Sequence, residues 1–298
     1  MSIQANEADP LSRQPRAERP AYATGMLLDA QDFTDEQTYH RGRLARALAF
    51  LAGGGTLAGL AVEHVPGSET QAEQIRVRPG VAVDRLGRLV ELPRSACLRL
   101  PRWFEREQSV DGGDTLRRAA YGDVGRFVSA RMAQAGTVLP ARAVVADVYL
   151  RFAACKVGLT PSFAAGPFDA LNAVSTSRLR DAYELQLVPR DGLDDDFDGL
   201  PQRPGAPVVG DAQADADARR DAVQDAVLAG YPVSGNGELA ALPEHPPGMD
   251  RSAVFIARVF IPVGEGTPPE RSADVPLVDN WSRRFLPPMG LVGQWLGV

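Results

Sequence analysis

The stretch TGMLLDAQDFTDEQTYHRGRLARALAFLAGGGTLAGL, residues 24–60, decides the fold because it contains one helix with clear end signals followed by the first strand. Thr34 and Gln37 have the spacing of a capping box, in which the two side chains satisfy backbone groups of the first turn. Residues 53–55 are three glycines, which favour the left-handed conformation at a helix C-terminus. We therefore predict a helix that begins near residue 34 and ends before residue 53.

The two halves of this helix differ in character. The second half carries an apolar stripe at helical spacing, which two polar residues extend toward the N-terminus: Leu44, Ala47, Leu48 and Leu51, then His40 and Gln37. The first half offers polar and aromatic side chains for contacts with another molecule, namely Glu36, Tyr39, Arg43 and Arg46. We expect Tyr22 and residues 26–28, which precede the helix, to pack back on it.

Composition and charge exclude several classes of protein. The chain has 298 residues, 44% of them hydrophobic, which is enough for one large or two ordinary domains with a core. A net charge of −6 argues against a general nucleic-acid-binding protein, because phosphate contacts need clustered lysine and arginine. The sequence has no apolar run long enough to span a membrane and no signal-peptide pattern, so we expect a cytoplasmic protein. Cys97 and Cys155 lie far apart in the sequence and are predicted to be buried free thiols.

After the glycines the chain is predicted to form sheet. Apolar and polar residues alternate over residues 75–78, and residues 84–87 predict a turn with a positive φ at Gly87, so residues 60–92 are predicted to form a β-meander. Alternation returns in residues 143–152 and 183–187, with a long loop predicted over 156–176. Residues 253–263 are apolar on both faces apart from Arg258, which indicates a central strand, and a short strand is predicted over 275–278.

These patterns predict a mainly β fold of the α+β class: an antiparallel meander or sandwich-like domain with an N-terminal helix and helical insertions. The expected order is a flexible arm (1–20), the leading helix and meander (21–102), a helical insertion (103–142), core strands (143–188), an acidic insertion rich in proline, glycine and alanine with one helix near 212–229 (189–250), and core strands with an apolar tail (251–298). Trp295 and Leu296 in that tail would form an exposed apolar patch unless they dock on something.

The common catalytic signatures do not occur in this sequence. The three histidines, His40, His64 and His245, do not have zinc-hydrolase spacing, and we find no nucleophile elbow, P-loop or dinucleotide fingerprint. A pair of carboxylates for glycoside hydrolysis stays open, because its geometry cannot be seen in a sequence. We therefore expect a protein that is not an enzyme and that needs no cofactor.

One segment is a candidate metal site. Asp194, Asp196 and Asp198, followed by Gly199, match the first half of a calcium-binding loop, in which alternate carboxylates converge on a hard cation. The second half of the loop does not match, since Gly205 stands where a glutamate is required. A solvated acidic linker is the alternative interpretation.

Several of these features together resemble an uncharacterised family associated with phage-tail-derived contractile injection systems and their baseplates. The resemblance is carried by Gly25-Met26-Leu27-Leu28, Asp32-Phe33, Glu36-Gln37, Tyr39-His40, Arg43, Arg46, Gly59-Leu60, Val62, Pro79-Gly80, Ala82, Asp84 and Gly87-Arg88. Weaker similarity recurs at residues 149–155, 177–185, 257–259 and 279–284. The resemblance implies a component of such a particle and carries no catalytic residues.

We therefore expect a structural or accessory subunit of a phage-tail-like injection particle, which acts by docking on other subunits and is located in the cytoplasm until it is assembled. Glu36, Tyr39, Arg43, Arg46, Trp295 and Leu296 are the expected interaction residues, and homo-oligomerisation is a further expectation. The alternatives are a fibre-like module that binds a glycan or a receptor, and an enzyme carried as cargo.

Overall fold

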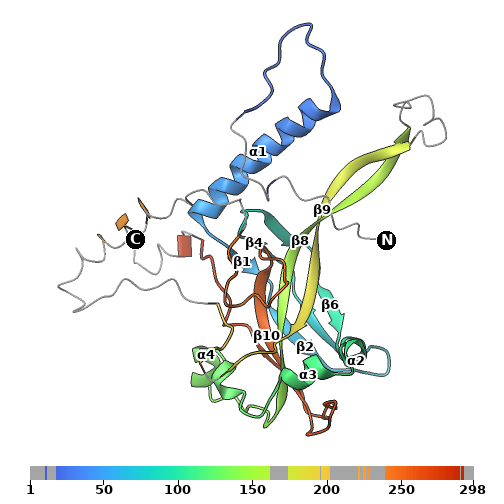
Figure 1. Cartoon of the computed structure of the whole chain (residues 1–298), viewed down its shortest axis with the longest axis vertical. Coiled ribbons are helices and arrows are strands. Elements are labelled where there is room, and N and C mark those ends of the chain that lie inside the picture. Colours follow the sequence, from blue (N-terminus) through green and yellow to red (C-terminus); the bar gives the residue numbers. More distant parts are fainter. Residues whose placement is uncertain are drawn as a thin grey trace.

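The fold is built on a long antiparallel hairpin, seen in Figure 1 as the strands β8 (Ala143–Pro161) and β9 (Val174–Pro189). The computed structural model describes residues 11, 18–161, 174–194, 196–201, 221, 224–225, 227–228, 239–288 and 290–291. β10 (Val254–Pro262) pairs with the first half of β8, and β11 (Leu277–Asp279) extends the sheet beyond β10. The other edge of β8 pairs first with the short strand β7 (Ala120–Tyr121) and, further along β8, with β9. The strand order is therefore β11-β10-β8-β7, with β9 also paired to β8. The mainly β, antiparallel fold is confirmed.

Residues 55–99 form two small sheets rather than one continuous meander. The first contains β1 (Gly55–Gly59), β4 (Gly80–Val83) and β5 (Leu89–Leu92), and the second contains β2 (Val62–Val65), β3 (Gln74–Val77) and β6 (Ala96–Arg99).

The chain passes between these two sheets at one crowded corner. Gly59 and Leu60 both have positive φ there, and the amide of Leu60 donates to the carbonyl of Pro79. A Cβ on Gly80 would lie 2.4 Å from the carbonyl oxygen of Ala58, so the backbones can cross only where glycine stands. This close crossing bends both strands and divides the predicted meander.

The arrangement of the core explains why the sequence of β10 has apolar residues on both faces of the strand. One face of the large sheet packs on the two small sheets, and the other face packs on residues 124–127, 193 and 249. All nine residues of β10 are buried, so the predicted central strand is confirmed.

The segment predicted as a helical insertion contains short helices and one strand. α2 (Leu100–Val110), α3 (Asp114–Arg118) and α4 (Ala130–Gln134) are separate pieces, with a 3₁₀ turn at Gly125–Phe127. Gly112 and Gly113 have positive φ and end α2, and residues 120–121 pair with β8 instead of continuing a helix. α2 packs on the core through Leu100, Trp103 and Phe104.

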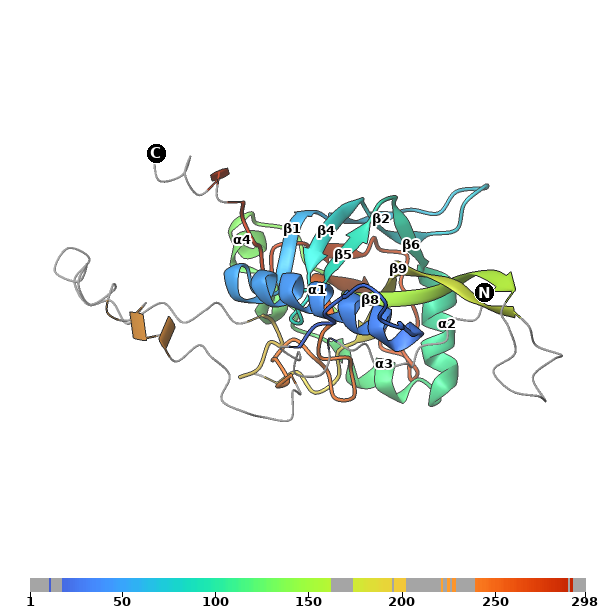
Figure 2. The same cartoon turned by 90° about the horizontal axis from the view of Figure 1, so that it is seen from above.

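The predicted loop over residues 156–176 is wrong at both ends, because β8 continues to Pro161 and β9 begins at Val174. The pairing of β10 with β8 ends at Leu150, whereas the pairing of β8 with β9 extends to Pro161 opposite Val174. Residues 151–161 and 174–184 therefore form a two-stranded extension, which we call the distal ribbon. Figures 1 and 2 both show it reaching beyond the body of the molecule.

Several predicted segments lie wholly or partly outside the described residues. They are the arm over 1–20 apart from residues 11 and 18–20, the helix over 212–229 apart from five residues, which are helical, and Trp295 and Leu296. The two cysteines are described, and neither is buried as predicted, since Cys97 is exposed and Cys155 is half-buried. Within the part of the chain that the structure describes, no helix is both long enough and apolar enough to cross a membrane.

Candidate interaction site

The N-terminal helix α1 (Ala30–Leu51) begins four residues before the predicted start. Asp29 is the N-cap residue: its Oδ1 accepts from the backbone amides of Gln31 and Asp32, at 2.7 and 3.2 Å. Asp32 completes a capping box by accepting from the amide of Asp29 at 2.9 Å. Thr34 lies inside the first turns, and its hydroxyl donates to the carbonyl of Ala30. The predicted cap at Thr34 is therefore wrong, because an aspartate pair closer to the N-terminus satisfies the same backbone groups.

The helix touches the body of the molecule over a very small area. Gly42 and Ala45 are its buried residues, although α1 has 22 residues. The turn between β4 and β5 lies against this point, where a Cβ on Gly87 would come within 1.7 Å of the Ala45 carbonyl oxygen. Gly87 has a φ of +84°, as the sequence predicted for this turn. The contact thus depends on small residues on both sides, and α1 rises above the body in Figure 1 and lies across it in Figure 2.

Most of the apolar stripe predicted on the second half of α1 is exposed, although Leu48 is half-buried. Leu44 is 60% exposed and Leu51 is 86% exposed, and Phe33, which lies N-terminal to the predicted stripe, is 49% exposed. Phe33 lies 11 residues before Leu44 and 18 before Leu51, which are spacings that return to the same side of a helix. The helix therefore presents one exposed face along its whole length.

The four predicted interaction residues on α1 are held by local contacts. Glu36 accepts a hydrogen bond of 2.6 Å from the hydroxyl of Tyr22, and this bond raises the pKa of Tyr22. The Arg43 guanidinium lies 5.1 Å from the centre of the Tyr39 ring, and Arg46 lies 5.2 Å from that of Phe50. These contacts fix the directions of the side chains at the surface of α1.

The segment before α1 folds back only in part. Tyr22 reaches Glu36, as described above, but Leu27 is 95% exposed and both Met26 and Leu28 are exposed. The prediction that residues 26–28 pack on the helix is therefore wrong. The helix and its lead-in together display more apolar surface than a helix that packs on its own core.

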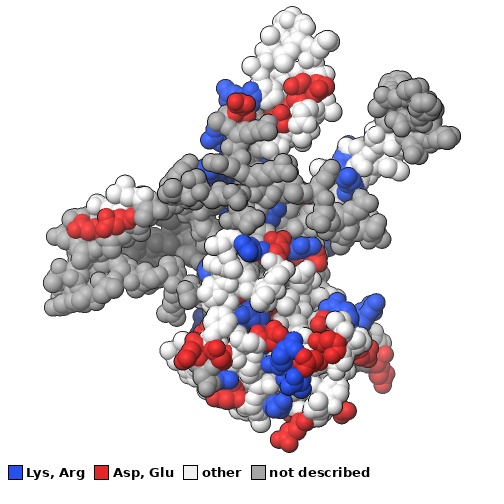
Figure 3. All heavy atoms as spheres, viewed as in Figure 1, with Lys and Arg blue, Asp and Glu red and all other residues white. Residues whose placement is uncertain are grey.

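The distal ribbon is the second exposed element. Its β9 half is exposed from Val174 to Asp181, and Leu159 and Leu179 are large apolar residues on its surface. Figure 3 shows basic residues on the ribbon, whereas red and blue are interspersed on the described face of the body. A two-stranded ribbon without a covering layer is only marginally stable in water. Such an element is typical of surfaces that become covered in an assembly.

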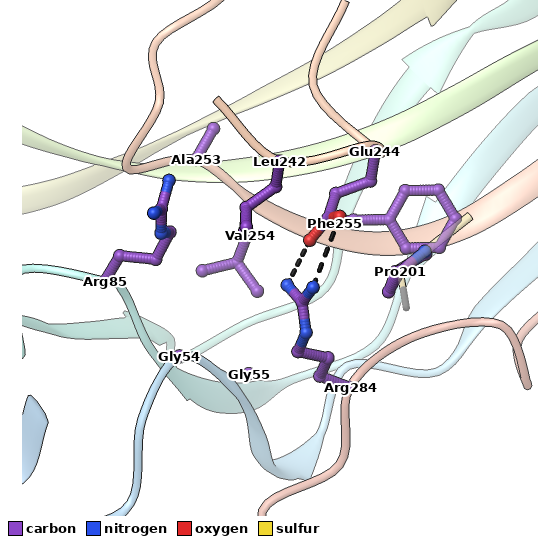
Figure 4. A pocket seen from close by; sticks show the side chains of 10 residues that line it. All are labelled: Gly54, Gly55, Arg85, Pro201, Leu242, Glu244, Ala253, Val254, Phe255 and Arg284. Carbon is purple, nitrogen blue, oxygen red and sulfur yellow. Dashed lines mark hydrogen bonds and ion pairs between the residues drawn. The ribbon is translucent and has the colours of Figure 1, made fainter. Parts of the chain in front are cut away.

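The pocket in Figure 4 lies where the glycines that follow α1 meet Arg284 and lining residues between positions 242 and 255. Gly54 and Gly55 form one wall, and the Glu244 carboxylate forms an ion pair with Arg284 across it. Arg85 donates to the carbonyls of Ala240 and Arg251, and burial lowers its pKa. Because carboxylate and carbonyl groups of the chain already satisfy these guanidinium groups, the pocket serves to join segments far apart in the sequence.

The predicted calcium half-loop does not gather its carboxylates. Asp194 accepts from the amide of Asp196 at 3.1 Å, and Asp198 accepts from the amide of Leu200 at 2.9 Å. Among the described residues, which do not include Asp195, no three acidic, histidine or cysteine side chains lie together in a way that could hold a metal ion. The carbonyl of Asp198 instead accepts from Nη1 of the buried Arg258 at 2.5 Å.

A buried charge cluster was not predicted. Arg258 on β10 donates to both carboxylate oxygens of Asp147 on β8, at 2.7 and 2.9 Å, and Arg190 lies 3.3 Å from the same carboxylate. The sequence showed Arg258 as an exception in an apolar strand but could not show its partner, which lies 111 residues earlier. The cluster holds the large sheet to the segment after β9.

Comparison of the sequence with known proteins finds no matching family model and no matching curated protein.

Proposed function

We propose that this chain is a structural or accessory subunit of a multiprotein particle and that it acts by docking on neighbouring subunits. The observation that carries the proposal is α1, a helix of 22 residues with two buried ones. Most helical stability in proteins comes from the packing of an apolar face on other parts of the protein. A helix whose apolar face is exposed can gain that stability by packing on a partner. The distal ribbon adds a second surface on which large apolar residues are exposed.

The chemistry of α1 supports docking on protein. Protein interfaces are enriched in aromatic residues and arginine, and α1 carries both in paired form, as Tyr39 with Arg43 and Phe50 with Arg46. These side chains lose little conformational freedom on binding, because they are already held by their ring contacts. Lower ordering costs favour association.

The resemblance in sequence supports a particular kind of particle. The block over residues 25–46 resembles a family associated with phage-tail-like contractile injection systems, and this block is the one that forms the lead-in and α1. We therefore propose a position in the baseplate or elsewhere in the tail of such a particle.

A receptor-binding or glycan-binding role is the second candidate. It is favoured by Trp281, which is 43% exposed and has the Arg131 guanidinium 3.7 Å from the centre of its ring. Exposed aromatic rings commonly stack on sugars. Among the described residues that line the pocket in Figure 4, however, Phe255 is the one aromatic residue. Trp281 therefore stands apart from that pocket's lining.

Electron microscopy and sedimentation of native particles test the proposal. Particles from cells that produce the chain should contain it after sedimentation, and particles from cells that lack it should be incomplete or unstable. Structurally normal particles without the chain would contradict the proposal. Retention of the chain on immobilised glycans, lost in Trp281→Ala and kept in Phe50→Ala, would support the second candidate.

A further inference from the structure

The exposed face of α1 has a regular spacing. Six residues, which we call the seam, follow each other at alternating steps of four and three, and all six are exposed: Phe33, Gln37, His40, Leu44, Ala47 and Leu51. This spacing repeats every seven residues and is the pattern by which two helices pack along each other in a coiled coil. A globular protein that merely leaves scattered apolar residues in water does not require this order.

The seam lies opposite the attachment of α1 to the body. At 100° per residue, Gly42 and Ala45 lie about 180° and about 120° around the helix from the seam. Since these two residues and Gly87 hold the helix on the body, the seam faces away from it. The geometry therefore leaves room for a second helix along the seam.

We propose that α1 packs along α1 of a second copy of this chain. The charges beside the seam support a second copy as the occupant. Glu36 and Arg43 flank the seam on one side, and Arg41 flanks it on the other. In a parallel pair Glu36 comes opposite Arg41 of the second copy, and in an antiparallel pair it comes opposite Arg43. Either orientation brings unlike charges together at two symmetric places.

The middle of the seam defines how the two helices align. Gln37 and His40 are polar residues at positions that are usually apolar, and polar seam residues specify register at a cost in stability. A pair of about three heptads with a polar centre is weak, with a dissociation constant on the order of micromolar. Such a contact becomes effective where neighbouring subunits raise the local concentration. The inference rests on the proposed docking role and names the partner of α1.

Sedimentation equilibrium of the purified full chain, from about 1 to about 200 μM, tests the pairing. The wild-type chain should shift from monomer to dimer over this range. Leu44→Glu places a charge in the seam and should raise the dissociation constant at least about tenfold. Val138→Glu is the control, because Val138 is 91% exposed and lies outside α1. A chain that stays monomeric throughout, or a Leu44→Glu variant that dimerises like the control, would overturn the proposal.

A charge exchange tests the choice of a second copy. Glu36→Lys should weaken self-association, and so should the double variant Arg41→Glu with Arg43→Glu. Mixing the two variants should restore association, since each supplies the charge that the other has lost. Absence of restoration in the mixture, with both variants folded by circular dichroism, would count against α1 pairing.

Co-sedimentation with native particles separates this inference from the proposed function. A chain that joins the particles although it never dimerises through the seam overturns the pairing alone. A chain that dimerises through the seam but is never found on particles overturns the proposed function alone.

Discussion

At the scale of single residues, the unusual feature is one buried carboxylate between two buried guanidinium groups. Asp147 and Arg258 are fully buried, and Arg190 is 3% exposed. Charges at this depth are tolerated because Arg258 also donates to the carbonyls of Asp198 and Gly199. Burial tends to lower the pKa of Arg258, but attraction to the Asp147 carboxylate outweighs that effect, so the pKa of Arg258 is raised. Asp147 is therefore the anion on which both arginines depend.

Asp147→Asn should be strongly destabilising, because it leaves two buried cations without a counter-charge. We expect a loss of about 3–5 kcal/mol in the free energy of unfolding, measured by urea denaturation. Glu63→Gln is a matched control, since Glu63 also bonds two arginines, Arg76 at 2.7 Å and Arg78 at 2.9 Å, but at the surface. It should cost less than about 1 kcal/mol. Equal losses in the two variants would show that burial is not the cause.

His245 should give the protein a pH-dependent stability. Burial lowers its pKa below the ordinary value of 6.5, and its Nε2 lies 2.9 Å from the carbonyl oxygen of Ala253. The unfolded chain therefore binds a proton more readily than the folded chain. This contribution to stability is complete above pH 6.5 and is lost as the pH falls through the lowered pKa of the folded state.

The expected result is a decrease in the free energy of unfolding between about pH 7 and about pH 5, measured by urea titration at each pH. In His245→Gln the part of this slope due to the buried imidazole should disappear. His40→Gln should keep the slope, because His40 is exposed on α1. An unchanged slope in His245→Gln would contradict the assignment.

At the scale of elements, α1 depends on its own end signals more than on the body. Removal of the N-cap in Asp29→Ala should cost about 1 kcal/mol of local helix stability, so the first amides of α1 should exchange hydrogen about fivefold faster. Thr34→Ala should leave exchange unchanged or slightly slower, because Thr34 bonds back to Ala30 inside the helix. Faster exchange in Thr34→Ala than in Asp29→Ala would restore Thr34 as the cap.

Local signals in the sequence predicted the elements whose causes are local. The apolar run of β10, the alternation in β3 and the positive φ of Gly87 each follow from nearby residues, and the structure confirms them. The start of α1 was missed because two capping boxes, Asp29 with Asp32 and Thr34 with Gln37, compete within nine residues. Sequence alone gives no energy difference large enough to choose between them.

The features that depend on distant residues could not be predicted in this way. The strands β1 to β6 divide into two sheets because Gly59 and Gly80 cross, and this contact joins residues 21 apart. Asp147 and Arg258 meet only after β8 and β10 have paired. Helical spacing defined the apolar face of α1 in the sequence, but it could not show what that face meets.

At the scale of the whole molecule, a well-packed body carries two exposed elements, α1 and the distal ribbon. In the part of the chain that the structure describes, three buried clusters cover both faces of the large sheet. The ribbon continues past the last residue of β8 that pairs with β10. Phe152 and Tyr183 at its base pack on the core, whereas residues 154–161 and 174–181 are mostly exposed. Folding and association are therefore expected to depend on different parts of the chain.

Shortening the ribbon tests this division. Ala153 and Ala182 are paired across β8 and β9, so an Asn-Gly turn can replace residues 154–181 without changing the register. The shortened chain should unfold cooperatively with a free energy within about 1 kcal/mol of the wild type, because the removed strand residues are mostly exposed. Its co-sedimentation with particles should decrease, whereas Val138→Glu should leave both properties unchanged. A large loss in the free energy of unfolding would instead show that the ribbon belongs to the folded body. Full co-sedimentation of a stable shortened chain would show that the ribbon is not needed for docking, so that α1 is the docking element.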